Sequence, residues 1–101
     1  MALYVQKFGG TSVGTTERIE AVANKVAGFS AQGHQVVVVV SAMSGETNRL
    51  LALSSAISDE PSPREMDVLL STGEQVTIAL LSMALQQHGL DARSYTGSLV
   101  K

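Results

Sequence analysis

The residues best suited to chemistry are gathered in Lys7–Val13, which has the sequence Lys-Phe-Gly-Gly-Thr-Ser-Val. This segment combines one cation, two glycines and two hydroxyl side chains where a strand pattern gives way to a helix pattern. Glycines let a phosphate approach the backbone, and the free amides at a helix amino terminus carry partial positive charge. The segment is therefore a candidate phosphate site, where one lysine–phosphate pair contributes on the order of 4 kcal/mol of Coulomb energy before desolvation.

The spacing of these residues excludes two common nucleotide motifs. In a P-loop the lysine follows the glycines, whereas here Lys7 precedes Gly9, Gly10 and Gly14. The glycines also miss the G-x-G-x-x-G spacing of dinucleotide sites. On its own, the segment is equally compatible with a strand that ends in a glycine turn beside a solvated lysine, so the rest of the chain must decide.

Two further polar clusters lie later in the chain. Ser41–Asn48 follows an apolar run, and Ser71–Gln75 interrupts a helical pattern. Each also has a purely structural interpretation: a loop in which Thr47 caps the next helix, and a turn between helices with Glu74 at the new amino terminus. A glycine inside a helix costs about 1 kcal/mol relative to alanine, so Gly73 requires a packing or functional reason.

Three segments have the composition of strands. Leu3–Phe8 is rich in β-branched and aromatic residues and is followed by two glycines. Val36–Val40 is a run of valines without alternation, which is typical of a strand buried on both faces in a parallel sheet. Ala92–Tyr95, set off by Gly89 and Gly97, predicts a third strand.

A helix is predicted from about Thr16, after the first strand. Thr15 or Thr16 can serve as its amino-terminal cap, and Glu17 suits the positive potential of the first turn. Its apolar residues follow the spacing of a helix with one buried face. These residues are Ile19, Val22, Ala23, Val26 and Phe29.

Two more helices are predicted after the valine run. The first covers about Asn48–Ser58, and the linker Asp59–Pro63, with two prolines and two acidic residues, separates it from the second. The linker ends in Ser-Pro, which suits the cap and first position of a helix that extends to about Gly89, with a break or kink at Gly73. One face of its second half carries Val76, Ala79, Leu80, Met83 and Ala84.

The order strand–helix–strand–helix–helix–strand predicts an α/β fold with a parallel sheet and helices on both faces. Ligands of such sheets bind beyond the carboxyl ends of the strands. The segments Lys7–Ser12 and Ser41–Thr47 each follow a strand. Topology alone therefore places them at one edge of the sheet as a joint site.

Composition narrows the class of protein. With 101 residues, 45% of them hydrophobic and 16% charged, the chain can bury a core and is not a disordered tail. A net charge of −2 argues against nucleic acid or an anionic membrane as partner, and the lack of cysteine excludes disulfides and thiolate nucleophiles. No secretory signal pattern is present and the longest unbroken apolar run is Val36–Val40, so a cytoplasmic protein is expected.

Together the three polar clusters resemble the amino acid kinase family, and within it the aspartate kinases. The matching segments are Lys7–Val13, Val39–Asn48 and Asp67–Gln75, and the resemblance covers residues 1 to about 97. It implies a parallel sheet sandwiched by helices, of which residues 1–101 form the amino-terminal part, with no regulatory ACT domain in this sequence. Ser98–Lys101 departs from the family pattern.

Aspartate kinases transfer the γ-phosphoryl group of ATP, which carries Mg²⁺, to the β-carboxylate of L-aspartate, the first step toward lysine, threonine and methionine. The resemblance implies that Lys7 is catalytic, that Thr47 holds aspartate, and that Glu74 holds aspartate through its ammonium group; no residue is assigned to a metal. The residues implied for the ATP phosphates are Lys7, Phe8, Gly9, Gly10, Thr11, Ser12 and Ser41. Because the attacking carboxylate is already ionised at neutral pH, the reaction needs positioning and charge neutralisation rather than a general base.

Two other interpretations stay open. The chain could belong to a kinase of the glutamate or acetylglutamate type, although Phe8–Ser12 favours aspartate, or it could be a truncated, non-catalytic binding module. As an isolated chain it is expected to be inactive. Because a short sheet leaves an unpaired edge and an uncovered apolar face, we also expect self-association, or pairing with a missing segment or a full-length subunit.

Overall fold

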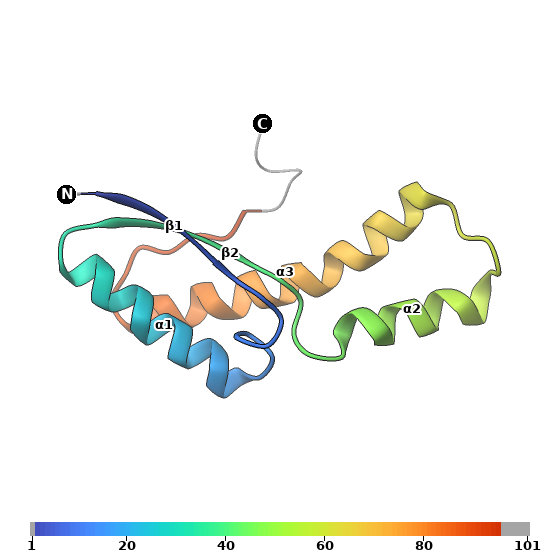
Figure 1. Cartoon of the computed structure of the whole chain (residues 1–101), viewed down its shortest axis with the longest axis horizontal. Coiled ribbons are helices and arrows are strands. Elements are labelled where there is room, and N and C mark those ends of the chain that lie inside the picture. Colours follow the sequence, from blue (N-terminus) through green and yellow to red (C-terminus); the bar gives the residue numbers. More distant parts are fainter. Residues whose placement is uncertain (1, 96–101) are drawn as a thin grey trace.

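The computed structural model describes residues 2–95, which form two strands and three helices (Figure 1). The predictions for Gly97 and Ser98–Lys101 lie outside the described residues. The molecule is elongated, with extents of 50 × 31 × 18 Å. In chain order the elements are β1 (Leu3–Phe8), α1 (Thr16–Ala31), β2 (Gln35–Val40), α2 (Glu46–Ile57) and α3 (Pro63–Gln87).

The two strands form a parallel sheet, and this confirms the predicted parallel α/β class. The register runs from Leu3 beside Gln35 to Phe8 beside Val40, so both strands end at the same edge. The third strand predicted over Ala92–Tyr95 is wrong, because this segment has no strand partner among the described residues. One contact that holds it is a hydrogen bond from the Gln86 side chain to the Ala92 carbonyl (3.0 Å).

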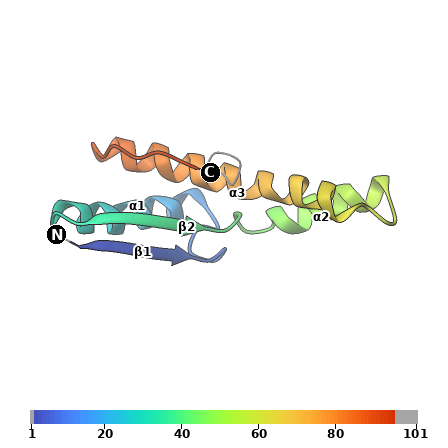
Figure 2. The ribbon, with the colours of Figure 1, turned by 90° about the horizontal axis from the view of Figure 1, so that it is seen from above.

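The sheet has one covered and one open face within the described part of the chain. Val36 and Val38 pack into the core beside α1 and α3, whereas Val37 and Val39 are 48% and 46% exposed. The prediction that this strand is buried on both faces is therefore wrong here. A parallel strand of valines needs cover on each side, and residues 2–95 place both α1 and α3 on the same side (Figure 2).

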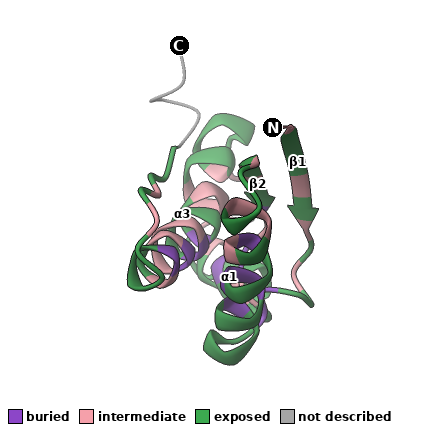
Figure 3. Cartoon of the chain, turned by 90° about the vertical axis from the view of Figure 1, so that its left-hand side faces the viewer, coloured by how far each residue is buried: buried purple, intermediate pink, exposed green. Residues whose placement is uncertain are grey.

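The core lies mainly between α1 and α3, where the buried residues gather in Figure 3. The apolar face predicted for α1 is confirmed, with Phe29 half-buried at its end and the others buried. The buried positions of α3 are Gly73, Thr77, Leu81 and Leu85. The face predicted from hydrophobicity is not the buried one, since its residues Val76 and Met83 are exposed. The buried face instead contains the small residue Gly73 and the polar residue Thr77.

The helix boundaries follow local signals closely. Ser62 caps α3 by accepting a hydrogen bond from the Glu65 amide (3.3 Å), and Pro63 begins the helix as predicted. α3 is continuous through Gly73, so the predicted break is wrong. α2 starts at Glu46 rather than Asn48, and together with the first half of α3 it projects beyond the strands (Figures 1 and 2).

Length and composition alone would allow α3 to cross a membrane, and α3 is the one helix within residues 2–95 of which this is true. In this fold α3 contacts α1, α2 and β2. It therefore serves here as the long central helix of the packed domain.

Candidate functional site

The two polar loops meet where the strands end. The Ser41 amide donates to the Phe8 carbonyl (3.3 Å), which ties the start of the second loop to the end of β1. A turn closed by the Ser12 amide and the Gly9 carbonyl (3.0 Å) folds the first loop back on itself. The two loops are thus adjacent at the carboxyl edge of the sheet, as topology predicted.

A polar pocket of about 370 Å³ opens between the two loops. Its lining offers four hydroxyl groups, one amide side chain and glycine backbone, and contains no carboxylate. Of the residues predicted for the site, the pocket brings together Gly10, Thr11, Ser41 and Thr47. The full lining is Gly10, Thr11, Ser41, Ala42, Met43, Ser44, Gly45, Thr47 and Asn48.

The amino end of α2 faces this pocket. Gly45 precedes the helix in a left-handed conformation (φ 80°) and provides no side-chain cap. The Glu46 amide is bound to the Met43 carbonyl (3.1 Å), while Thr47 and Asn48, next in the first turn, line the pocket. Uncapped first-turn amides of a helix attract anions, so this end of α2 suits a phosphate or a carboxylate.

The charges nearest this helix end largely offset each other. Glu46 would oppose an anion, but its carboxylate forms an ion pair with Arg49 (2.9 Å) one turn along the helix. An exposed pair of this kind adds little to stability. Its consequence here is that the local field is dominated by the helix end rather than by Glu46.

The amino end of α1, in contrast, is closed by its own residues. Thr15 caps the helix by accepting from the Arg18 amide (3.2 Å), as predicted. The Glu17 carboxylate accepts from its own backbone amide and from Thr15, and these bonds lower its pKa. The free amides expected after the first loop are therefore supplied by α2 rather than by α1.

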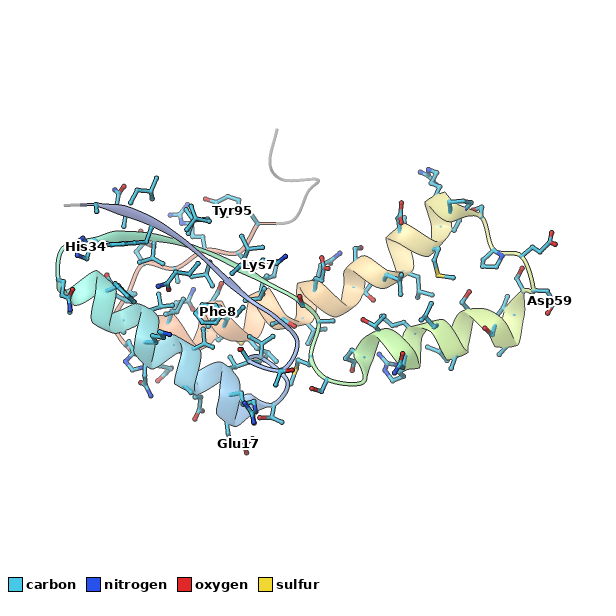
Figure 4. All side chains as sticks on the ribbon, viewed as in Figure 1. Lys7, Phe8, Glu17, His34, Asp59 and Tyr95 are labelled. Atoms are coloured by element: carbon cyan, nitrogen blue, oxygen red, sulfur yellow. The ribbon has the colours of Figure 1, made fainter. Side chains whose placement is uncertain are left out.

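The other residues predicted for phosphate binding are arranged differently. Lys7 and Phe8 lie on opposite sides of β1 (Figure 4), with Lys7 on the open face of the sheet beside Val39. Phe8 and Ser12 line a separate pocket of about 220 Å³, where the Lys25 ammonium lies 5.9 Å from the centre of the Phe8 ring. The lining of the polar pocket, within residues 2–95, does not include Lys7, Gly9 or Glu74.

Gly73, which precedes Glu74 in α3, packs against the second loop. A Cβ atom placed on Gly73 would lie 3.0 Å from the Ala42 Cβ and 3.8 Å from the Glu46 Cβ. The helix backbone therefore touches both the second loop and the start of α2 next to Glu74. Packing therefore explains why α3 contains glycine at residue 73, where a side chain would crowd Ala42.

Sequence reasoning gave no role to Gly14 and Ser44. A Cβ atom on Gly14 would collide with the Ser44 Oγ and lie 3.0 Å from the Gly10 carbonyl oxygen, so a side chain here would displace the Ser44 hydroxyl and crowd the first loop. The sequence signal was a third glycine within six residues, at Gly9, Gly10 and Gly14. Within the described residues no three His, Asp or Glu side chains gather in a way that could hold a metal ion.

Known proteins resemble this chain along almost its whole length. Residues 2–100 match the sequence model of the amino acid kinase family. The chain is 68% identical over 101 residues, its whole length, to an aspartokinase of Pseudomonas aeruginosa, and 65% identical over 97 residues, 96% of its length, to aspartokinase 2 of Bacillus subtilis.

A solved structure gives the same result in three dimensions. The crystal structure of aspartate kinase from Synechocystis matches 95% of this chain with a TM-score of 0.90 and 58% sequence identity. The chain spans 24% of the length of the two bacterial relatives and 16% of the solved chain.

Proposed function

Because the chain belongs to the amino acid kinase family, we propose that it forms part of the active site of an aspartate kinase. The reaction is the transfer of the γ-phosphoryl group of ATP to the β-carboxylate of L-aspartate. The observation that carries the proposal is the polar pocket at the carboxyl ends of β1 and β2, into which the open end of α2 points. The high identity to aspartokinases along the whole chain favours aspartate over other acceptors.

The phosphate side of the site is assigned to β1 and the first loop. Gly9 and Gly10 give an ATP phosphate access to the backbone, and Ser41 and Thr11 add hydroxyl donors. Lys7 adds a full positive charge from a flexible side chain near the end of β1. A lining of hydroxyls, amides and glycine without a carboxylate fits phosphate oxygens, and Mg²⁺ would arrive bound to ATP.

The aspartate side is assigned to the first turn of α2 and to Glu74. Thr47 offers a hydroxyl beside the uncapped helix end, which favours a carboxylate. Glu74 is exposed and suited to bind the ammonium group of the amino acid. Two opposite charges of the substrate would thus be held by two helices that meet at Gly73.

The chemistry required of these residues is positioning and neutralisation. The β-carboxylate of aspartate is ionised at neutral pH and attacks without a general base. The transferring phosphoryl group spreads negative charge over its oxygens, and a cation such as Lys7 would stabilise that charge. The proposed residues contain the donors that such a transition state needs.

A chimera tests the proposal directly. Residues 1–101 of this chain replace the matching 24% of the Pseudomonas aeruginosa aspartokinase, and ADP release is measured with Mg·ATP and L-aspartate. We expect activity comparable to that of the parent enzyme, and no acceleration by L-glutamate. A folded chimera that is inactive with aspartate would overturn the proposal, and the isolated chain serves as the control that is expected to be inactive.

A further inference from the structure

We propose that Gly73 is a positioning residue, which sets the distance between the second loop and Glu74 through its contact with Ala42. The inference rests on the proposed function, because it concerns the same site. A glycine is unfavourable inside a helix, yet α3 contains Gly73 and is continuous through it. Gly73 is not among the glycines with positive φ, so the backbone conformation does not require it.

The residues packed around Gly73 explain why a side chain is not favoured at this position. A Cβ atom at this position would lie 3.0 Å from the Ala42 Cβ, closer than carbon atoms normally pack, whereas the next neighbour, the Leu50 Cδ1, would be at 3.5 Å. Ala42 and Leu50 are 8% and 4% exposed. The crowding therefore involves one methyl group in a closed interior, the side chain of Ala42.

Ala42 has little room to move away from an added methyl group. Its carbonyl oxygen lies next to the first loop, at an ordinary contact distance of 3.5 Å from where a Cβ atom on Gly10 would be. The preceding residue, Ser41, is hydrogen-bonded to the Phe8 carbonyl at the end of β1. Ala42 is thus held between the first loop and α3, and pressure from Gly73 would be transmitted to the pocket.

The residues with proposed roles are attached to the two sides of this contact. Ser41 precedes Ala42 and Glu74 follows Gly73, while Thr47 belongs to the helix whose Glu46 and Leu50 pack against the same point. An added methyl group at residue 73 would move α3 away from the second loop and α2. Glu74 and Thr47, which are proposed to hold the two ends of one small substrate, would then be displaced relative to each other.

A double-mutant cycle in the chimera tests the inference, with Gly73→Ala, Ala42→Gly and the double variant. Gly73→Ala is expected to raise the KM for aspartate about tenfold, which corresponds to about 1.4 kcal/mol, while the KM for ATP changes less than about twofold. Ala42→Gly removes the methyl group that Gly73→Ala collides with. The double variant is therefore expected to return the KM for aspartate to within about twofold of the parent value.

Gly28→Ala is the matched control, because it is the same change inside α1 and its added Cβ would meet nothing within 4 Å. It is expected to leave both KM values unchanged. Normal kinetics of Gly73→Ala would overturn the inference, as would a defect that Ala42→Gly does not relieve. If Gly73→Ala fails to fold, the double variant decides: recovery of folding and of aspartate binding supports the contact, and continued misfolding overturns it.

The unsubstituted chimera separates the two proposals. If it is active and the cycle shows no coupling, the positioning role fails while the proposed function stands. If it is inactive with aspartate, the proposed function fails, and the positioning role fails with it. Thermal unfolding of the four proteins then still reports whether residues 42 and 73 are coupled in packing.

Discussion

Lys7 and Glu74 carry the opposite charges of the proposed site, and each stands on a regular element rather than on a loop. Lys7 is the penultimate residue of β1, and Glu74 lies in the middle of α3. Within residues 2–95 neither takes part in an ion pair. Both charges are therefore available to a ligand, and removing either should affect binding or turnover more than stability.

Lys7→Ala in the chimera is expected to lower kcat by on the order of 100-fold, because the cation proposed to neutralise the transferring phosphoryl group is lost. Thermal stability should change little, since the side chain is exposed. Steady-state kinetics and a melting curve measure the two effects. Arg64→Ala, which removes an exposed cation at the start of α3, serves as the control, and a Lys7 variant that keeps full turnover would contradict the phosphate role.

Glu74→Ala is expected to raise the KM for aspartate by about 10- to 100-fold, because a charge-assisted hydrogen bond to the ammonium group is lost. The KM for ATP should stay near the parent value. Glu20→Ala, an exposed acidic residue on α1, provides the comparison for a simple change in net charge. Unchanged kinetics toward aspartate would remove Glu74 from the site.

At the level of elements, the two helices that follow the strands differ at their amino ends. α1 is closed by Thr15 and Glu17, whereas α2 begins at a glycine with no side-chain cap. A side-chain cap stabilises a helix by about 1 kcal/mol relative to alanine but only by a few tenths of a kcal/mol relative to glycine, so Gly45 leaves the end of α2 open at little cost. The open end lies where a ligand carrying negative charge is proposed to bind.

The stability that Glu17 contributes should depend on pH. Its pKa is lowered in the folded chain by the bonds from its own amide and from Thr15. A lowered pKa means that the folded state binds the proton less well than the unfolded state, so the contribution is present above the unfolded-state pKa. It is lost as the pH falls through the folded-state pKa.

Unfolding of the chimera and its Glu17→Gln variant over a pH series checks this dependence. We expect the parent to be more stable at neutral pH and the difference to vanish in acid. The Glu20→Gln variant, on the same helix but beyond the first turn, should show a smaller dependence. A stability difference that persists or grows in acid would contradict the role of Glu17 at the helix end.

At the scale of the whole molecule, the sheet has one apolar face that no helix within residues 2–95 covers. Val5, Val37 and Val39 are 68%, 48% and 46% exposed, on neighbouring strands and on the side away from α1. An apolar sheet face of this kind is normally covered. Lys7 lies on the same face, so whatever covers the valines also approaches the proposed catalytic lysine.

The isolated chain is expected to associate with itself through this face. Sedimentation analysis should show species larger than a monomer, and Val5→Thr combined with Val37→Thr should shift them toward the monomer. Ile57→Thr tests whether any exposed apolar residue has this effect, because Ile57 is 89% exposed on α2. A stable monomer of the unsubstituted chain would refute the expectation.

The sequence by itself determined the features that depend on neighbouring residues. The cap at Thr15, the Ser-Pro start of α3 and the buried face of α1 follow from side chains within one or two helical turns of each other. The parallel arrangement and the meeting of the two loops also followed, because connection rules leave few alternatives for this order of elements.

Only the tertiary structure decided the features that depend on residues far apart in the chain. Gly73 and Thr77 are buried in α3 because of what packs against them, and hydrophobicity does not reveal such positions. The free helix end belongs to α2 because Thr15 and Glu17 occupy that of α1. The segment 92–95 pairs with no described strand because pairing requires a partner edge, which local sequence cannot supply.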